Sequence, residues 1–122
     1  MLTPEVIEGF VKTLLLKRFY NPAPIPTCHR EWWGLCTSQS RYVSIAAPRG
    51  FAKSTAITHS YTLANVLFRE RDFVVIVSGT EAQSILFLND IKNELTENED
   101  LRKLFGIKNP KTWPKDAESD II

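Results

Sequence analysis

The sequence predicts an α/β fold with three layers around a parallel sheet, preceded by N-terminal helices. Three segments support this prediction: a short apolar segment at 41–46, an amphipathic stretch at 54–69 and a continuous apolar run at 73–77. A strand, a helix and a second strand within about 40 residues form a βαβ unit with parallel strands. The run at 73–77 contains three valines, as expected of a strand covered on both faces.

Length and composition limit the classes of protein. The 122 residues correspond to about one domain, and the 43% of apolar residues are enough for a core. A net charge of +1 excludes the strongly basic footprint of a dedicated nucleic-acid-binding domain, but not DNA contact through a local patch. No stretch reaches the roughly 18 apolar residues of a membrane span, and residues 1–10 do not resemble a signal peptide. The two cysteines indicate free thiols in a reducing cytoplasm.

Two helices are expected before the first strand. Thr3 and Pro4 form a helix start, and apolar residues recur at helical spacing through 4–19. The proline-rich stretch 21–26 cannot continue that helix. Thr27 is then expected to cap a second helix through residue 36, followed by a loop at 37–40.

Further elements are expected after the second strand. Thr80 and Gln83 have the spacing of a capping box, so a helix should run from there to about residue 95. A short charged helix at 98–105 should end at Gly106. We expect a loop at 107–117, and residues 120–122 look like the beginning of a strand.

The segment 47–55 carries the most chemistry. Its sequence, Ala-Pro-Arg-Gly-Phe-Ala-Lys-Ser-Thr, follows the layout of the Walker A motif or P-loop, GxxxxGK[ST], between the first strand and its helix. In such a loop, successive backbone N–H groups and the helix N-terminus hold phosphates. Lys53 would reach the β- and γ-phosphates, and the Ser54 hydroxyl would coordinate Mg²⁺. The motif therefore predicts the binding of nucleotide phosphates and Mg²⁺, with Thr55 as the helix-facing neighbour.

The loop departs from the pattern at both glycines, which are Ala47 and Ala52 here. A left-handed backbone at a residue other than glycine costs about 1–2 kcal/mol, so the cost could arise twice unless Gly50 supplies the necessary freedom. Arg49 is an additional cation within the loop. An ordinary turn with a solvated lysine is the alternative interpretation.

A nucleotide hydrolase also needs an acid at the end of another strand. Asp90 follows an apolar stretch, but helical spacing indicates a residue on a helix surface. Asp120 precedes its apolar pair, which is the wrong order. The sequence therefore supplies no convincing catalytic acid.

Other candidate sites have simpler explanations. Cys28, His29 and Cys36 lack a good fourth ligand for zinc. The acids at 97–100 fit the start of a helix better than a metal site. The tryptophan pair at 32–33 could stack on an adenine or a DNA base, but filling the gap between the first helices and the sheet is the favoured role.

Three segments in order resemble one family. They are His29-Arg-Glu-Trp-Trp33, the loop 47–55, and Val77-Ser-Gly-Thr-Glu-Ala-Gln-Ser84. The chain resembles the N-terminal part of the ATPase domain of phage terminase large subunits, the DNA-packaging motors, from about residue 27 to 105. These proteins commonly have a deviant loop that tolerates alanine at the position of Ala52.

The resemblance implies a domain organisation and a site. Residues 1–40 would be a helical, adenine-proximal segment, and 41–122 the first part of a P-loop NTPase core. Residues 47–55 would hold the phosphates of ATP and Mg²⁺. Within them, Lys53 and Arg49 would act in catalysis, with Arg49 placed to sense or stabilise the γ-phosphate within or between subunits. The family's acidic motif, coupling motif and nuclease domain have no counterpart here. We therefore expect the parent protein to be an ATP hydrolase and this chain alone to be inactive.

The resemblance also implies partners and a location. The full-length protein would act on double-stranded DNA as a ring of copies, with the portal and the small terminase subunit, in the cytoplasm of the bacterial host and away from membranes. A helicase-like or other P-loop ATPase fragment is an alternative, because it would share the loop and the upstream aromatic segment. A non-catalytic remnant is the second alternative.

Overall fold

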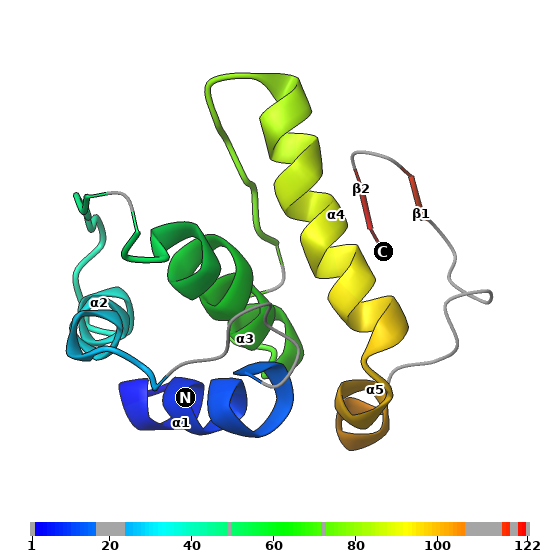
Figure 1. Cartoon of the computed structure of the whole chain (residues 1–122), viewed down its shortest axis with the longest axis horizontal. Helices are drawn as coiled ribbons and strands as arrows, with labels where there is room; N and C mark the ends of the chain where they lie inside the picture. The colour runs from blue at the N-terminus through cyan, green and yellow to red at the C-terminus, as the bar shows by residue number, and fades with distance from the viewer. Residues whose placement is uncertain are drawn as a thin grey trace. The chain divides into compact units, whose positions relative to one another are not determined.

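Helices make up nearly all of the regular structure that the computed structural model describes (Figure 1). The described residues are 2–16, 24–48, 50–71, 73–106, 116–117 and 120–121. They belong to two units, Met1–Val74 and Val75–Ile122. The expected division of the chain at residue 40 stays a prediction.

The described residues of the first unit form three helical segments. The elements in chain order are α1 (Pro4–Phe10), η1 (Val11–Leu15), α2 (Thr27–Cys36), η3 (Ser54–Tyr61) and α3 (Thr62–Leu67). α1 continues directly into η1, and η3 into α3; both η segments have π-helical geometry. π-helical turns are rare in proteins, and those that occur often lie at functional sites.

The core of the first unit lies where these helices meet. α1 contacts α2, and α2 contacts η3. The ring of Phe10 meets that of Phe68 edge to face, with centroids 5.8 Å apart, which joins α1 to the end of α3. The buried apolar side chains are those of Leu2, Ile7, Phe10, Val11, Leu14, Leu15, Ile25, Trp32, Trp33, Ala56, Leu63 and Ala64.

The described residues of the second unit form two helices and a short strand pair. These are α4 (Glu81–Glu97), α5 (Glu99–Phe105), β1 (Asp116–Ala117) and β2 (Asp120–Ile121). Asn98 joins the two helices: its Nδ2 donates to Glu94 Oε2 over 3.0 Å, and its Oδ1 accepts from the Leu101 N–H over 3.1 Å. Gly106 ends α5 in the left-handed conformation, with φ of +67°.

The predicted α/β fold with a parallel sheet is wrong for the described residues. The segments 42–48 and 73–78 have no strand partner among the residues that the structure describes. The paired strands of the described part are β1 and β2, which are antiparallel, with Asp116 opposite Ile121. β2 lies where the sequence suggested the beginning of a strand. β1 lies within the loop that was expected at 107–117. Residues 107–115 of that loop are outside the described residues.

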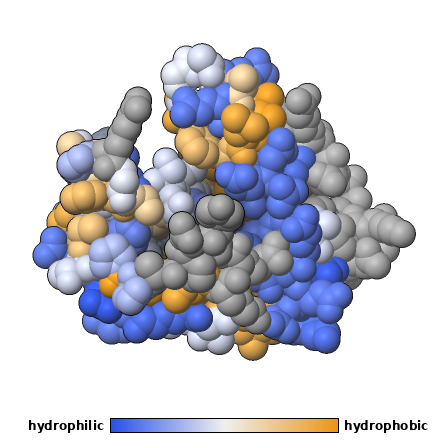
Figure 2. All heavy atoms as spheres, viewed as in Figure 1, coloured by the Kyte–Doolittle hydropathy of each residue, from blue (hydrophilic) through white to orange (hydrophobic). Residues whose placement is uncertain are grey.

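The side chains of the two segments explain why a sheet was predicted and is not observed. Tyr42 is 89% exposed, Phe73 82% and Val77 84%. A strand covered on both faces needs neighbouring strands and a helix layer on each side, and two strands alone are marginally stable. Apolar composition indicated a buried strand, but the helices of the described residues pack on one another instead. Figure 2 shows hydrophobic atoms at the surface around the beginning of α4, where Leu86 is also exposed.

The predicted helices are confirmed, with two corrections to their ends. Thr3 and Thr80 cap their helices as expected, accepting from the Val6 N–H over 3.3 Å and the Gln83 N–H over 3.2 Å. Thr27 does not act as a cap, because it is the first helical residue of α2 after Pro26. The helix expected over 54–69 ends at residue 67, and residues 17–19 of the first predicted helix lie outside the described residues.

Candidate functional site

The backbone of the loop changes hand immediately before the lysine. Gly50 has φ of +90° and Ala52 has φ of +54°, both in the left-handed region. Lys53 follows with φ of −60° and ψ of −44°, which is right-handed. Ala47 is not among the described residues with positive φ. The conformational cost of replacing the two glycines of the motif therefore arises once, at Ala52, and amounts to about 1–2 kcal/mol.

This change of hand affects where the N–H groups point. Alternation between left-handed and right-handed residues turns successive N–H groups toward one side, and such nests bind anions. The N–H of Ala56 donates to the carbonyl of Ala52 over 3.0 Å. The N–H groups of Lys53, Ser54 and Thr55 precede this first helical bond, and they lie at the positive end of the helix. These N–H donors are therefore arranged so that they can bind an anion.

The predicted site side chains differ in exposure. Lys53 and Ser54 are exposed, and Thr55 is half-buried. An exposed lysine side chain beside a helix N-terminus can change its rotamer to contact a ligand that binds from solution. Pro48 and Phe51 are also exposed, whereas Arg49 lies outside the described residues, so its predicted role stays a prediction.

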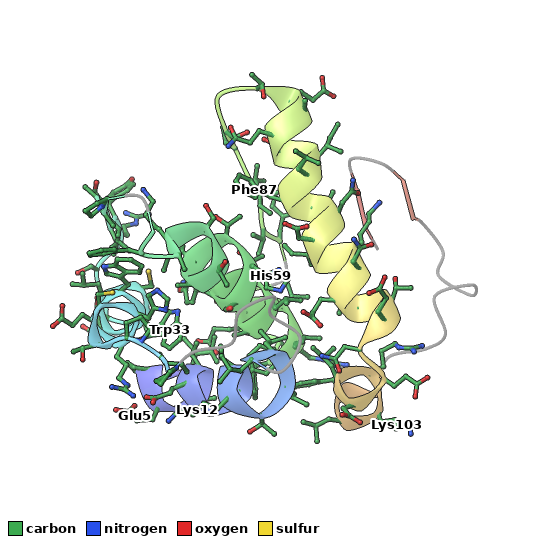
Figure 3. The ribbon with its side chains drawn as sticks, viewed as in Figure 1. Glu5, Lys12, Trp33, His59, Phe87 and Lys103 are labelled. Carbon is green, nitrogen blue, oxygen red and sulfur yellow. The ribbon has the colours of Figure 1, made fainter. Side chains whose placement is uncertain are left out.

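Two buried side chains of α2 contact the loop and the helix that follows it. The carbonyl of Phe51 can only accept, so His29 Nε2 donates to it, over 2.7 Å. Trp33 Nε1 donates to the carbonyl of Ala56 over 3.0 Å. Trp33 thus extends from α2 toward the helix that carries Ala56 (Figure 3). The two acceptors enclose residues 52–55.

The ring of His29 is held by its neighbours. It lies 5.1 Å from the ring of Trp32 and 6.0 Å from that of Trp33, measured between centroids. His29 is 8% exposed and Trp33 1%. The donors of both side chains are therefore fixed in a packed environment. Both tryptophans are buried, but α2 packs against α1 and η3 rather than against the predicted sheet.

A cavity of about 430 Å³ lies under the loop. This volume is within the range of about 300–1,000 Å³ that is typical of small-molecule sites. Both π-helical segments contribute to its wall, together with α2 and the loop. Its lining residues are Val11, Leu16, Ile25, Pro26, Cys28, His29, Trp33, Gly50, Phe51, Ala52, Thr55, Ala56 and Ser60.

The other candidate sites have structural roles in the described residues. Asp90 is exposed on α4. Glu99 and Asp100 occupy the first turn of α5, which Asn98 caps. Burial raises the pKa of the Cys36 thiol, which disfavours the thiolate that zinc requires. In the described part of the chain, no three His, Cys, Asp or Glu side chains could together hold a metal ion.

Sequence reasoning placed the segment 29–33 near the nucleotide only through the family resemblance, and it missed the two bonds to the loop. The signal that could have found them is the spacing of His29 and Trp33, which are four residues apart and so share one face of a helix. The acceptors could not have been found in this way, because Phe51 and Ala56 contribute main-chain oxygens.

Comparison of the chain with protein-family models, curated proteins and solved structures found no match. None of the helices among the described residues is long and apolar enough to cross a membrane. The geometry of the loop and its surroundings is therefore the basis for a functional proposal.

Proposed function

We propose that residues 47–55 bind the phosphates of ATP together with Mg²⁺, and that the chain is the ATP-binding part of a phage terminase large subunit. The observation that carries this proposal is the left-handed Ala52, with φ of +54°, directly before Lys53 at the start of a helix. A lysine, a hydroxyl and a concave run of N–H groups at one helix N-terminus form a set suited to phosphate.

Each residue has a role in this proposal. The N–H groups of residues 53–55 donate hydrogen bonds to phosphate oxygens at the positive end of the helix. The ammonium group of Lys53 neutralises charge on the outer phosphates, and the Ser54 hydroxyl is the protein ligand for Mg²⁺. Mg²⁺ supplies further charge neutralisation when bound. By resemblance, Arg49 stabilises the γ-phosphate.

The wider function rests on the sequence resemblance. The complete motor hydrolyses ATP and moves double-stranded DNA into a capsid as a ring of copies. The portal and the small terminase subunit are its partners, in the cytoplasm of the bacterial host. For residues 1–122 we propose nucleotide binding rather than hydrolysis, because we assign no residue as the acid that orients the attacking water.

The first prediction concerns the binding of Mg²⁺-ATP. Ligand at 100 times its dissociation constant should stabilise the folded chain by about 2.7 kcal/mol, measured by thermal or chemical unfolding. Lys53→Ala should lose most of this stabilisation, because the phosphates lose their cation.

Lys103→Ala is the matched control, because Lys103 is an exposed lysine on a different helix, α5. It should keep the full stabilisation. Equal stabilisation of the wild type and Lys53→Ala, or none in a folded wild type, would remove the loop as a phosphate site.

A further inference from the structure

We propose that His29 and Trp33 are positioning residues, which hold the loop-to-helix turn in the conformation that receives phosphate. This inference rests on the proposed function and deepens it. In this inference, the segment 29–33 supports phosphate binding by holding main-chain carbonyls of the loop and its helix. It does not recognise a base.

The first step is the placement of the two bonds. His29 Nε2 holds the carbonyl of Phe51 at 2.7 Å, and Trp33 Nε1 holds the carbonyl of Ala56 at 3.0 Å. Four residues, 52–55, lie between these acceptors, and they include the left-handed residue and the first N–H groups of the helix. Both donors lie on one face of α2, about one helical turn apart.

The second step follows from the geometry of the peptide bond. No cis peptide bond occurs among the described residues, so the peptide that joins Phe51 and Ala52 is trans. In a trans peptide the carbonyl and the next N–H point in opposite directions. Because His29 draws the Phe51 carbonyl toward α2, the N–H of Ala52 points away from α2. The histidine therefore sets the direction of one N–H group at the start of the turn.

The third step concerns the strain at Ala52. Its left-handed backbone is unfavourable for a residue other than glycine, so the loop needs contacts that hold it there. Both donors are buried, with His29 8% and Trp33 1% exposed. The bond to Ala56 is buried and the bond to Phe51 is partly buried, which limits the competition of water for these carbonyls. The two bonds therefore help to keep the turn formed before a ligand arrives.

The decisive comparison is between His29→Gln and His29→Met. The amide nitrogen of glutamine can replace Nε2 as the donor to Phe51, whereas methionine has similar length and no donor. The probes are Mg²⁺-ATP and Mg²⁺-tripolyphosphate, which has no base. We expect His29→Met to bind both probes about tenfold more weakly than His29→Gln, because one net hydrogen bond changes affinity by about that factor.

Three results would overturn the inference. Equal affinities of the Gln and Met variants for both probes would mean that the bond does not position the loop. A loss confined to ATP would assign His29 to the base. A lower melting temperature with unchanged affinity of the folded protein would leave only a structural role.

A second measurement works without nucleotide. Amide hydrogen exchange at residues 50–56 should be faster in His29→Met than in His29→Gln, while exchange in α1 should not differ. If the wild type binds neither probe, the proposed function fails, and this exchange experiment still decides whether His29 holds the loop.

A second pair of variants covers the case in which His29→Met does not fold. Trp33→Phe removes the indole donor to Ala56, and Trp32→Phe removes a neighbouring buried indole while keeping both bonds to the loop. We expect faster exchange at 50–56 and weaker tripolyphosphate binding only in Trp33→Phe. The same behaviour in both variants would contradict the inference.

Discussion

A single backbone angle at Ala52 accounts for the deviation of this loop from the usual motif. Gly50 and Ala52 are left-handed, with φ of +90° and +54°, and Ala47 is not. Glycine is favoured only where such an angle is required. The first glycine of the motif is therefore dispensable here, whereas the second is replaced at a cost.

We predict that Ala52→Gly stabilises the chain. The substitution relieves about 1–2 kcal/mol of backbone strain, but it costs about 0.4–1 kcal/mol because glycine raises the entropy of the unfolded chain. The midpoints of these ranges leave a net gain of about 0.8 kcal/mol. The gain can be measured as the change in the free energy of unfolding in urea.

Ala47→Gly provides the opposite expectation. Because Ala47 has an ordinary backbone angle, this variant should lose about 0.4–1 kcal/mol of stability. The same sign of change in both variants would contradict the assignment of the strained residue to position 52.

At the scale of elements, a charge cluster joins α1 to α2. Glu8 Oε1 lies 2.8 Å from Arg30 Nη2 and 2.9 Å from Lys12 Nζ. The hydrogen bond from Arg30, followed by that from Lys12, lowers the pKa of Glu8 from 4.5 to about 2. The side chain of Glu8 is 19% exposed, whereas those of Arg30 and Lys12 are 44% and 53% exposed, so the cluster lies at the surface.

The lowered pKa of Glu8 predicts a pH dependence of stability. The folded state holds the charged carboxylate more strongly than the unfolded state does. Its contribution is therefore present above pH 4.5 and is lost as the pH falls from about 4.5 to about 2. The difference in unfolding free energy between the wild type and Glu8→Gln should shrink over this window.

Glu31→Gln serves as the control, because it removes an exposed carboxylate next to Arg30 and leaves the cluster intact. The unfolding free energy of Glu31→Gln should fall between pH 4.5 and about 2 as that of the wild type does, because Glu8 still loses its charge there. A difference between wild type and Glu8→Gln that stays constant down to pH 2 would show that the cluster does not join the two helices energetically.

The sequence predicted the helices well because their signals are local. Thr3, Thr80 and Gly106 act within a few residues of themselves, and apolar spacing defines one helix face. A strand depends on partners that are distant in the chain. The apolar run at 73–77 indicated a strand, but it has no strand partner among the described residues. The same limit applies to the site: the motif identified 47–55, but the bond from His29 to Phe51 joins residues 22 positions apart.

At the scale of the whole molecule, two apolar segments lack the protection of a sheet. Residues 42–48 and 73–78 have no helix and no strand partner among the described residues, and Tyr42 and Phe73 are 89% and 82% exposed. The second segment also crosses the boundary between the two units, which falls after Val74. Exposed segments outside regular secondary structure are preferred sites of proteolysis.

We predict that brief digestion with chymotrypsin cleaves first after Tyr42 and Phe73. Phe10 and Trp33 are buried in helices and should resist cleavage. Mass spectrometry of the early fragments identifies the cut sites, and digestion in denaturant should show cleavage at the buried sites as well. Protection of both early sites in the native chain would indicate that these segments are paired.

The bonds that anchor the loop also have a consequence for how related chains can differ. Phe51 takes part only through its main-chain oxygen, which every amino acid possesses, and its side chain is 48% exposed. Exchange of residue 51 therefore keeps the acceptor, whereas exchange of His29 removes the donor unless the new side chain can supply one. Among sequences that descend from the same ancestor, position 51 should vary freely, whereas position 29 should keep side chains that can donate a hydrogen bond. Evolution would then conserve only the donor residue of this contact.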